Sequence, residues 1–297
     1  MSEQFSKVGD GLLVRAPGKV NLSLLVKGNR PDGFHNIETI MAKINWFDEI
    51  LIEPGQKTGI ELICQGQYKV PERKDNLVYK AAKLLFDTVG RTENVRLTLT
   101  KNVPAGAGLG SGSSDAAATL MGLNEHLGLK LGRNKLAKMA ATLGSDVAFF
   151  LDGPIALCTA RGEKVKKLPR CEFRALLILP DISVSTAEVY ANYRHDSARY
   201  HRLHKQISEY IDKKRIDLVC QMCANMLQES CFELHTELAT LKKKVESRWL
   251  RLVCLSGSGS TMFYIIDRNN EEKVSACRDT LEQDYGCRGI IVDNNSW

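Results

Sequence analysis

A glycine-rich stretch, VPAGAGLGSGSSDAAATLMGLNEHLG (residues 103–128), contains the residue types that most clearly suggest chemistry. Four glycines stand at alternate positions in it: Gly106, Gly108, Gly110 and Gly112. A helical pattern then opens with Ser113, Ser114 and Asp115. Glycine lets backbone N–H groups face a ligand, and a helix start adds unpaired donors and about half a positive charge. The stretch predicts a polyphosphate cradle; the structural alternative is a flexible loop before an ordinary helix.

The spacing of this loop excludes three familiar nucleotide-binding loops. A dinucleotide fingerprint needs G-x-G-x-x-G, and these glycines alternate instead. A Walker loop ends in Gly-Lys-Ser/Thr, whereas this loop has no lysine after Lys101. No His-Arg-Asp or Asp-Phe-Gly set of the protein kinases follows it.

Two charged residues in apolar surroundings are further candidates for chemistry. RAPGKVNLSL places Lys19 in a predicted strand with little other charge, and LGSDVAFFL places Asp146 directly after a helix stop. A carboxylate can accept the proton of an alcohol as its bond to phosphorus forms. A lysine nearby can hold that carboxylate ionised and offset charge on the transferred group. The structural alternative is an ion pair between packed elements.

The predicted elements indicate an α+β protein of two closely joined domains. Strands are expected from Leu12 to Glu53, with a turn at NRPDGFHN, and the capped pattern DNLVYKAAKLLFDTVG predicts a helix ending at Gly90. Helices dominate from about His201 to Arg251, and the chain ends strand, helix, strand. We expect the first domain to span residues 1–170 and the second to span residues 171–297.

Composition sets further limits. The 297 residues carry a net charge of +6, spread along the chain, which suits a protein handling polyanionic small molecules. No apolar run approaches a membrane span and no secretion signal is evident, so a cytoplasmic location is expected. Nine cysteines at irregular spacing predict free thiols, and the C-x-x-C pair Cys220 and Cys223 is expected to be structural.

Four segments together resemble the galactokinase, homoserine kinase, mevalonate kinase and phosphomevalonate kinase (GHMP) superfamily. They are RAPGKVNLSL, RPDGFHNIET, PAGAGLGSGSSDAA and LGSDVAFFL, and SGSGSTMF resembles the superfamily's C-terminal glycine motif. Because the first two segments occur together, the chain resembles the 4-diphosphocytidyl-2-C-methyl-erythritol kinase branch rather than the sister kinases of the superfamily. The resemblance implies the GHMP kinase fold, with an N-terminal ribosomal-protein-like β/α domain and a C-terminal ferredoxin-like α/β domain.

The resemblance also implies roles for individual residues. It implies that Lys19 and Asp146 are catalytic. It implies an ATP site formed by Asn76, Pro104, Ala105, Gly106, Ala107, Gly108, Leu109, Gly110, Ser111, Gly112, Ser113, Ser114 and Asp115. It implies contacts to the second substrate from Asn21, Phe34, His35, Thr186 and Tyr190. Asp115 stands where close relatives often have Asn, so it either contacts the nucleotide or caps the second helical turn.

The implied reaction is ATP-dependent phosphorylation of the 2-hydroxyl of a cytidine diphosphate conjugate of methylerythritol, in non-mevalonate isoprenoid synthesis. ATP is then a co-substrate, and Mg²⁺ is expected because phosphoryl transfer needs charge neutralisation. We expect no nucleic-acid or membrane partner and a monomer or weak homodimer. Two alternatives stay open: a sister kinase acting on another small alcohol, and a noncatalytic nucleotide- or RNA-binding module. The basic segment 194–216, with His195, His201 and His204, is expected to be an exposed face.

Overall fold

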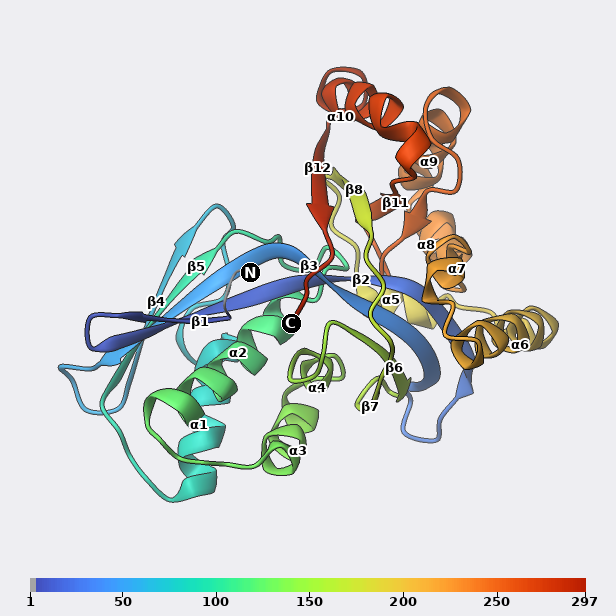
Figure 1. Ribbon diagram of the computed structural model, residues 1–297. Coiled ribbons are helices and arrows are strands. Elements are labelled where there is room, and N and C mark those ends of the chain that lie inside the picture. The colour runs from blue at the N-terminus through green and yellow to red at the C-terminus, as the bar shows by residue number, and fades with distance from the viewer. Residues whose placement is uncertain (1–3) are drawn as a thin grey trace.

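Two long strands, β2 (Gly11–Asn29) and β3 (His35–Pro54), organise the first sheet of the computed structural model, which describes residues 4–297. They pair antiparallel, and register shifts between Pro17 and Lys19 and between Asn21 and Ser23 bend them (Figure 1). The other strands are β1 (Phe5–Val8), β4 (Ile60–Gly66), β5 (Val95–Lys101), β6 (Ile155–Ala160), β7 (Lys164–Lys167) and β9 (Ala224–Asn225). Their order is β1-β2-β3-β5-β4, with β6 joining β3 and β7, and β9 beside β2.

Four helices lie on one face of this sheet (Figure 1). They are α1 (Leu77–Val89), α2 (Ser111–His126), α3 (Arg133–Leu143) and the short α4 (Val147–Phe150). The sequence offers Asp75 or Asn76 as the cap of α1; the Asn76 side chain is the one that caps it, and left-handed Gly90 ends the helix as predicted. The helix after the glycine loop begins at Ser111, two residues before its expected start at Ser113, because left-handed Gly110 turns the chain directly into it. Small side chains let α2 lie buried between α1 and β2.

The second sheet is antiparallel and has the order β10-β11-β8-β12. Its strands are β8 (Arg174–Pro180), β10 (Cys254–Leu255), β11 (Met262–Ile265) and β12 (Cys287–Asp293). The helices of this half are α5 (Thr186–Ala191), α6 (Ser197–Asp212), α7 (Ile216–Cys220), α8 (Gln228–Leu234), α9 (Thr236–Arg248) and α10 (Glu271–Tyr285), and one-turn 3₁₀ helices lie at Arg73–Asp75 and Arg268–Asn270. The division at residue 170 remains a prediction. Two segments of the second half return to the first: β9 pairs with β2, and Asn294 bridges to Ile44.

The cysteines differ in part from the expectation of free thiols. Cys223 and Cys254 form a disulfide, and the other seven cysteines are free. Folding brings the turn after α7 beside the start of β10, where the two Cα atoms lie 5.1 Å apart. This pairing joins residues 31 positions apart, which their irregular spacing in the sequence does not reveal.

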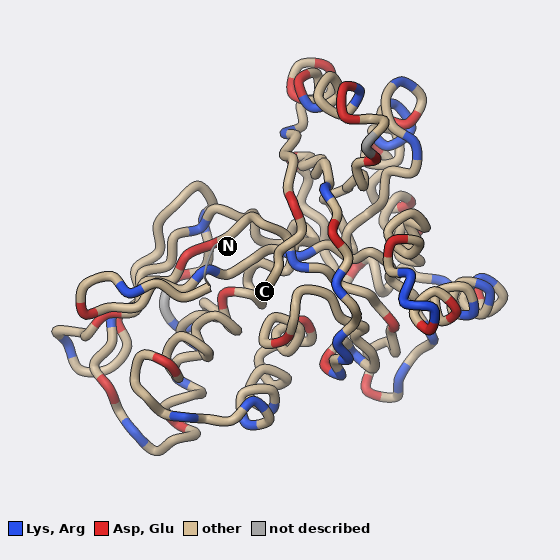
Figure 2. The backbone as a smooth tube through the Cα atoms, viewed as in Figure 1, with Lys and Arg blue, Asp and Glu red and all other residues tan. Residues whose placement is uncertain are grey.

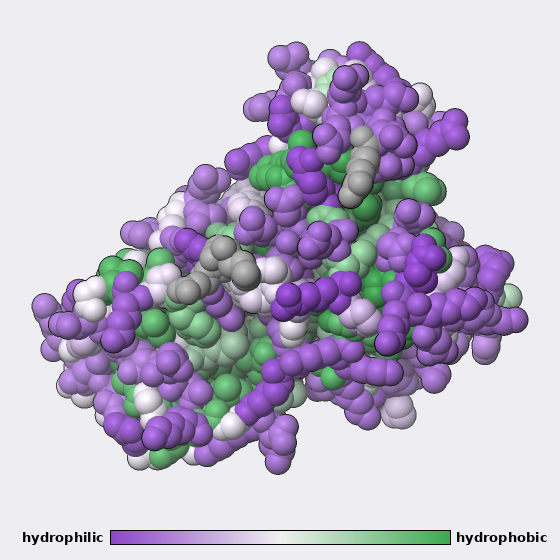
Figure 3. Space-filling view, viewed as in Figure 1, coloured by the Kyte–Doolittle hydropathy of each residue, from purple (hydrophilic) through white to green (hydrophobic). Residues whose placement is uncertain are grey.

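The surface agrees with the expected solvated face at segment 194–216. Figure 2 shows frequent Lys and Arg positions along α6, and hydrophilic residues predominate on the face in Figure 3. The three histidines here bond to different partners: His195 to Tyr193, His201 to Ser197 and His204 to Glu38. Their rings all contact the ring of Tyr200. Within residues 4–297, no helix combines the length and apolar character needed to span a membrane.

Candidate active site

The glycine loop between β5 and α2 is held in place by close packing. A Cβ on Gly108, whose φ is +79°, would collide with the carbonyl oxygen of Ser256. A Cβ on Gly110 would meet the Lys19 side chain at 2.9 Å. The backbone N–H of Lys19 donates to the Leu109 carbonyl at 2.9 Å. Glycine is therefore required because β2 and the Ser256 segment approach the loop so closely. The start of α2 opens onto a cavity, whose lining includes Gly110, Ser111, Gly112 and Ser113.

Lys19 lies buried at the floor of this cavity, beside the first bend of β2. Its Nζ donates to Asn21 Oδ1 and to the Gly108 carbonyl, both at 2.6 Å, and lies 3.9 Å from Asp146 Oδ2. Burial lowers the pKa of Lys19, and the Asp146 carboxylate opposes that change. Its partners thus fix the ammonium between the glycine loop and Asp146.

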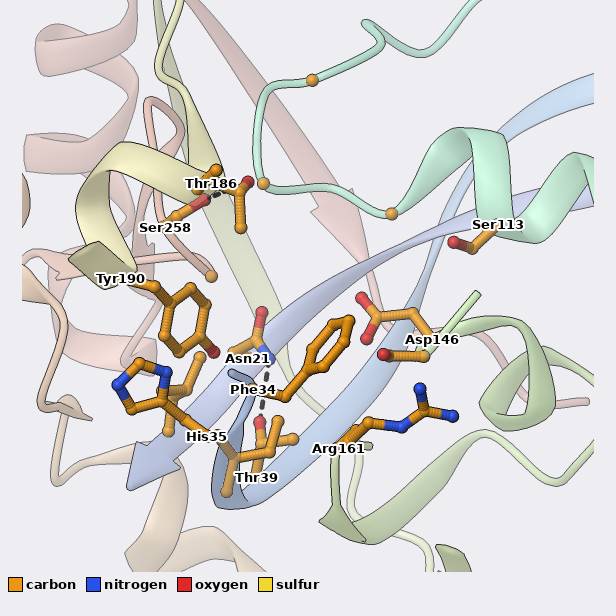
Figure 4. Close-up of a pocket in the computed structure, with 18 of the residues that line it drawn as sticks. Asn21, Phe34, His35, Thr39, Ser113, Asp146, Arg161, Thr186, Tyr190 and Ser258 are labelled. Atoms are coloured by element: carbon orange, nitrogen blue, oxygen red, sulfur yellow. Dashed lines mark hydrogen bonds between the residues drawn. The ribbon is translucent and has the colours of Figure 1, made fainter. Parts of the chain in front are cut away.

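Asp146 is positioned at the N-terminus of α4, directly after the turn at Gly144 that ends α3. Its side chain is about one-third exposed and faces the cavity, and it makes no capping hydrogen bond to α4. Figure 4 shows its carboxylate between Ser113 and Phe34. A carboxylate beside a lysine and open to a ligand can accept a proton from an alcohol.

The other end of the cavity carries aromatic side chains. The His35 and Tyr190 rings lie 5.0 Å apart with a tilt of 35°. Phe34 is 51% exposed, and its ring projects into the same space (Figure 4). Burial, with the nearby His195, lowers the pKa of His35, so its imidazole is neutral near pH 7. A flat ligand can therefore meet two aromatic faces and a neutral imidazole that can donate or accept a hydrogen bond.

Polar side chains connect the two ends of the cavity. Asn21 Nδ2 donates to Thr39 Oγ1 at 2.8 Å, which leaves Asn21 Oδ1 for Lys19. The hydroxyls of Thr186 and Ser258 lie 2.8 Å apart at the upper rim in Figure 4. The structure thus gathers both predicted catalytic residues and all five predicted substrate contacts in one cavity of about 750 Å³.

Several predicted ATP contacts lie elsewhere. Leu109 and Ser114 are buried, and the Asn76 side chain accepts from the Val78 N–H and donates to the Pro71 carbonyl. A second cavity, of about 420 Å³, is lined by Pro104, Ala105, Gly106 and Ala107. Gly106 lines both cavities. The loop therefore borders both spaces: its first residues line the second cavity, and its later residues line the first.

Asp115 lies in a buried ion cluster rather than in the cavity lining. The Lys101 ammonium contacts Asp48 and lies 2.7 Å from Asp115 Oδ2, while Asp48 also accepts from the Asn102 and Val103 N–H groups. Desolvation raises the pKa of Asp115 to about 8; the Lys101 ammonium opposes this change, and the Asp48 carboxylate adds to it. The Asp115 side chain makes no capping hydrogen bond. It braces β5 against α2 behind the loop.

Arg161 is a cavity residue that the sequence analysis missed. Its guanidinium carbon lies 5.2 Å from the centre of the Phe34 ring, and Figure 4 places it near Asp146. The chain presents it on a tight turn in which Ala160 has φ +65° and Gly162 has φ +121°. Of the cavity residues that the structure describes, Lys19 and Arg161 are the only lysine and arginine. The ARGEK sequence is the only signal that could have indicated this turn.

Comparison with known proteins agrees with this geometry. The family described as GHMP kinases N terminal domain matches residues 76–154. A 4-diphosphocytidyl-2-C-methyl-D-erythritol kinase of Geobacillus sp. (strain WCH70) is 38% identical over 87% of this chain and 89% of its own. The protein of that name from Bacillus subtilis (strain 168) is 37% identical, over 95% and 98%. The chain belongs to the 4-diphosphocytidyl-2-C-methyl-D-erythritol kinase family.

Solved structures place this kinase in the GHMP kinase fold. A crystal structure of 4-(cytidine 5'-diphospho)-2C-methyl-D-erythritol kinase matches with a TM-score of 0.75 and 29% identity, over 96% of this chain and all of the other. Homoserine kinase from Cytophaga hutchinsonii also matches with a TM-score of 0.75, over 99% and 98%, but at 19% identity it supports the fold alone. The prediction of a small-molecule kinase of this superfamily is confirmed.

Proposed function

We propose that this kinase transfers the γ-phosphoryl group of ATP to the 2-hydroxyl group of 4-diphosphocytidyl-2-C-methyl-D-erythritol, a step of non-mevalonate isoprenoid synthesis. The observation that carries the proposal is the convergence of three features in one cavity. These are the Lys19–Asp146 pair, the start of α2 with its glycine loop, and the Phe34–His35–Tyr190 group. A noncatalytic nucleotide binder needs no proton acceptor beside the phosphate loop.

In the proposed mechanism, the loop and the first turn of α2 hold the triphosphate through backbone N–H groups. Asp146 accepts the proton of the 2-hydroxyl, and Lys19 stabilises charge on the phosphoryl group while it keeps Asp146 ionised. Asn21 fixes Lys19 through the 2.6 Å hydrogen bond. The 2-hydroxyl is tertiary, since C2 carries the methyl group, so accurate positioning is essential for the attack.

We propose that the cytosine lies between Phe34 and Tyr190, with His35 at its polar edge. The exposed face of Phe34 supports this, because an aromatic ring open to solvent at a cavity wall is available for stacking. We also propose that the two sheets correspond to the ribosomal-protein-like and ferredoxin-like domains, in a cytoplasmic enzyme.

Mg²⁺ is proposed as the metal that accompanies ATP. Among the described residues, no three His, Cys, Asp or Glu side chains are arranged to hold a metal ion. Asp146 is the one carboxylate among the described residues that line this cavity, and serine hydroxyls such as that of Ser113 lie beside the loop (Figure 4). Such a sparse set fits an ion that keeps its waters and binds mainly phosphate oxygens. When bound, Mg²⁺ neutralises charge on those oxygens.

The test is Asp146→Asn, with Asp87→Asn as the control because Asp87 pairs with Lys83 on the exposed face of α1. We expect Asp146→Asn to bind ATP normally and to lose at least about 100-fold in kcat, the range for a general base. Alcohol-dependent ATP consumption is measured with the cytidine diphosphate conjugate, homoserine and mevalonate. Near-normal turnover of Asp146→Asn, or a preference for another alcohol, would contradict the proposal.

A further inference from the structure

Four cysteines gather at the end of α7, outside the active site. Cys220 ends α7, and Cys223 in the following turn forms the disulfide with Cys254. Cys171, in the segment between β7 and β8, faces Cys220, and the two thiols are hydrogen-bonded to each other. A surface cavity of about 570 Å³ is lined by Cys171, Cys220 and Cys223. A small molecule can therefore reach a thiol pair beside an existing disulfide.

The two free thiols of this cysteine cluster differ in character. Cys171 is partly exposed, and the hydrogen bond that it receives from Cys220 lowers its pKa. Cys220 is buried, and that same bond, together with burial, raises its pKa. The thiolate is the nucleophile in sulfur chemistry. Because Cys171 is partly exposed at the cavity and Cys220 is buried, Cys171 is suited to attack first, and Cys220 is positioned to resolve the product.

The cysteine cluster is connected to the active site through the chain on either side of the disulfide. Cys223 directly precedes β9, where Asn225 Nδ2 donates to the carbonyls of Leu255 and Gly257 at 2.8 Å each. Cys254 begins β10, which leads into the segment that places Gly257 in the active-site cavity. The disulfide thus braces two segments that support the cavity wall.

We propose that the cysteine cluster is a thiol-modification site, at which a low-molecular-weight disulfide oxidises Cys171 and Cys220 to a second disulfide. The Cys171 thiolate attacks one sulfur of the reagent RSSR, the reagent's S–S bond breaks, and RS⁻ leaves. Cys220 then gives up its proton and attacks the Cys171 sulfur, which releases a second RS⁻. The protein loses two protons and two electrons, and the reagent takes them up to become two RSH.

Two observations favour thiol chemistry over a zinc site with these four cysteines as ligands. Two of them are already joined as a disulfide, and a disulfide sulfur is not a thiolate ligand. In addition, no group of three or more metal-ligating side chains is arranged for a metal ion within residues 4–297.

The test treats the full-length kinase with bis(2-hydroxyethyl) disulfide and maps its cysteines by mass spectrometry of non-reduced peptides. Cys64 is the internal control, because it is partly exposed like Cys171 but burial raises its pKa. We expect Cys171 to react at least about tenfold faster than Cys64 and to end in a Cys171–Cys220 disulfide. In Cys220→Ser, the mixed disulfide at Cys171 should accumulate.

The proposal is overturned if Cys64 reacts as fast as Cys171, or if the wild-type chain forms no Cys171–Cys220 disulfide. Stoichiometric zinc in the protein as purified, lost in Cys171→Ser, would also overturn it. The decisive readout uses the wild-type chain, so it does not depend on how the variants fold. It measures mass rather than phosphoryl transfer, so its outcome is independent of the proposed function.

Discussion

Lys43 is a buried lysine whose replacement should change both stability and catalysis. Its Nζ donates to the carbonyls of Phe150 at 3.1 Å and Asp152 at 2.6 Å. These two carbonyls lie at and just after the end of α4, and Asp146 lies at its start. The Nζ also lies 5.9 Å from the centre of the Trp297 ring. Lys43 thus fastens the far end of α4, and Lys43→Met removes the charge while it keeps most of the volume.

The size of the effect follows from the pKa of Lys43. Burial lowers it from 10.5 to about 7; the Asp152 carboxylate opposes this change, and Arg133 and Lys167 add to it. At about 1.4 kcal/mol per pH unit, that difference corresponds to roughly 5 kcal/mol. Between pH 7 and pH 10.5 the unfolded chain holds a proton that the folded chain does not. Stability from this group therefore rises with pH across that window.

Urea unfolding of wild type and Lys43→Met from pH 6 to pH 10 measures this contribution. We expect the wild type to gain about 4 kcal/mol relative to the variant between pH 7 and pH 10. Other titrating groups are common to both proteins and cancel in the difference. Asp146 lies at the start of α4. Lys43→Met should therefore also lower kcat by a larger factor than it raises the KM of ATP or of the cytidine diphosphate substrate. Parallel stability curves across this range would refute the reasoning.

Three further substitutions test other parts of the structure. Arg161→Met should raise the KM of the cytidine diphosphate substrate about tenfold and leave that of ATP unchanged, since the guanidinium faces the substrate end of the cavity; equal effects on both, in steady-state kinetics, would contradict this. His35→Ala should likewise weaken the binding of the cytidine substrate far more than the binding of ATP, as measured by calorimetric titration. Asp115→Asn should stabilise the protein at pH 7 in urea unfolding. The raised pKa means that the folded state holds an extra proton between about pH 4 and pH 8, so the stability of the wild type falls as pH rises through this range, and this fall should be absent in the variant.

The sequence was sufficient to indicate the candidate residues Lys19 and Asp146 and the glycine loop, which the structure places around one cavity, because each signal is local. The glycine spacing, the helix start and the isolated charges at Lys19 and Asp146 can all be recognised within short segments. Caps such as Asn76 and Gly90 are equally local, and the structure confirms them. The assignment of individual ATP contacts stays a prediction.

The sequence could not predict features that depend on distant pairings. Asp115 forms its ion cluster only because β3 pairs with β5 and brings Asp48 beside Lys101. Lys43 could not be distinguished from a surface lysine until α4 was placed over it. The presentation of Arg161 depends on backbone angles that no residue pattern indicates reliably.

The contact between Gly108 and the Ser256 segment has a consequence for how the chain can be divided. Ser256 Oγ donates to the same Gly108 carbonyl that accepts from the Lys19 ammonium. The Gly108 carbonyl oxygen therefore links the glycine loop to β2, near the start of the chain, and to the Ser256 segment, near its end. A fragment ending at residue 170 would keep Lys19 and Asp146 yet lack this tie, so a split gene would need both pieces to reassociate before either could catalyse anything.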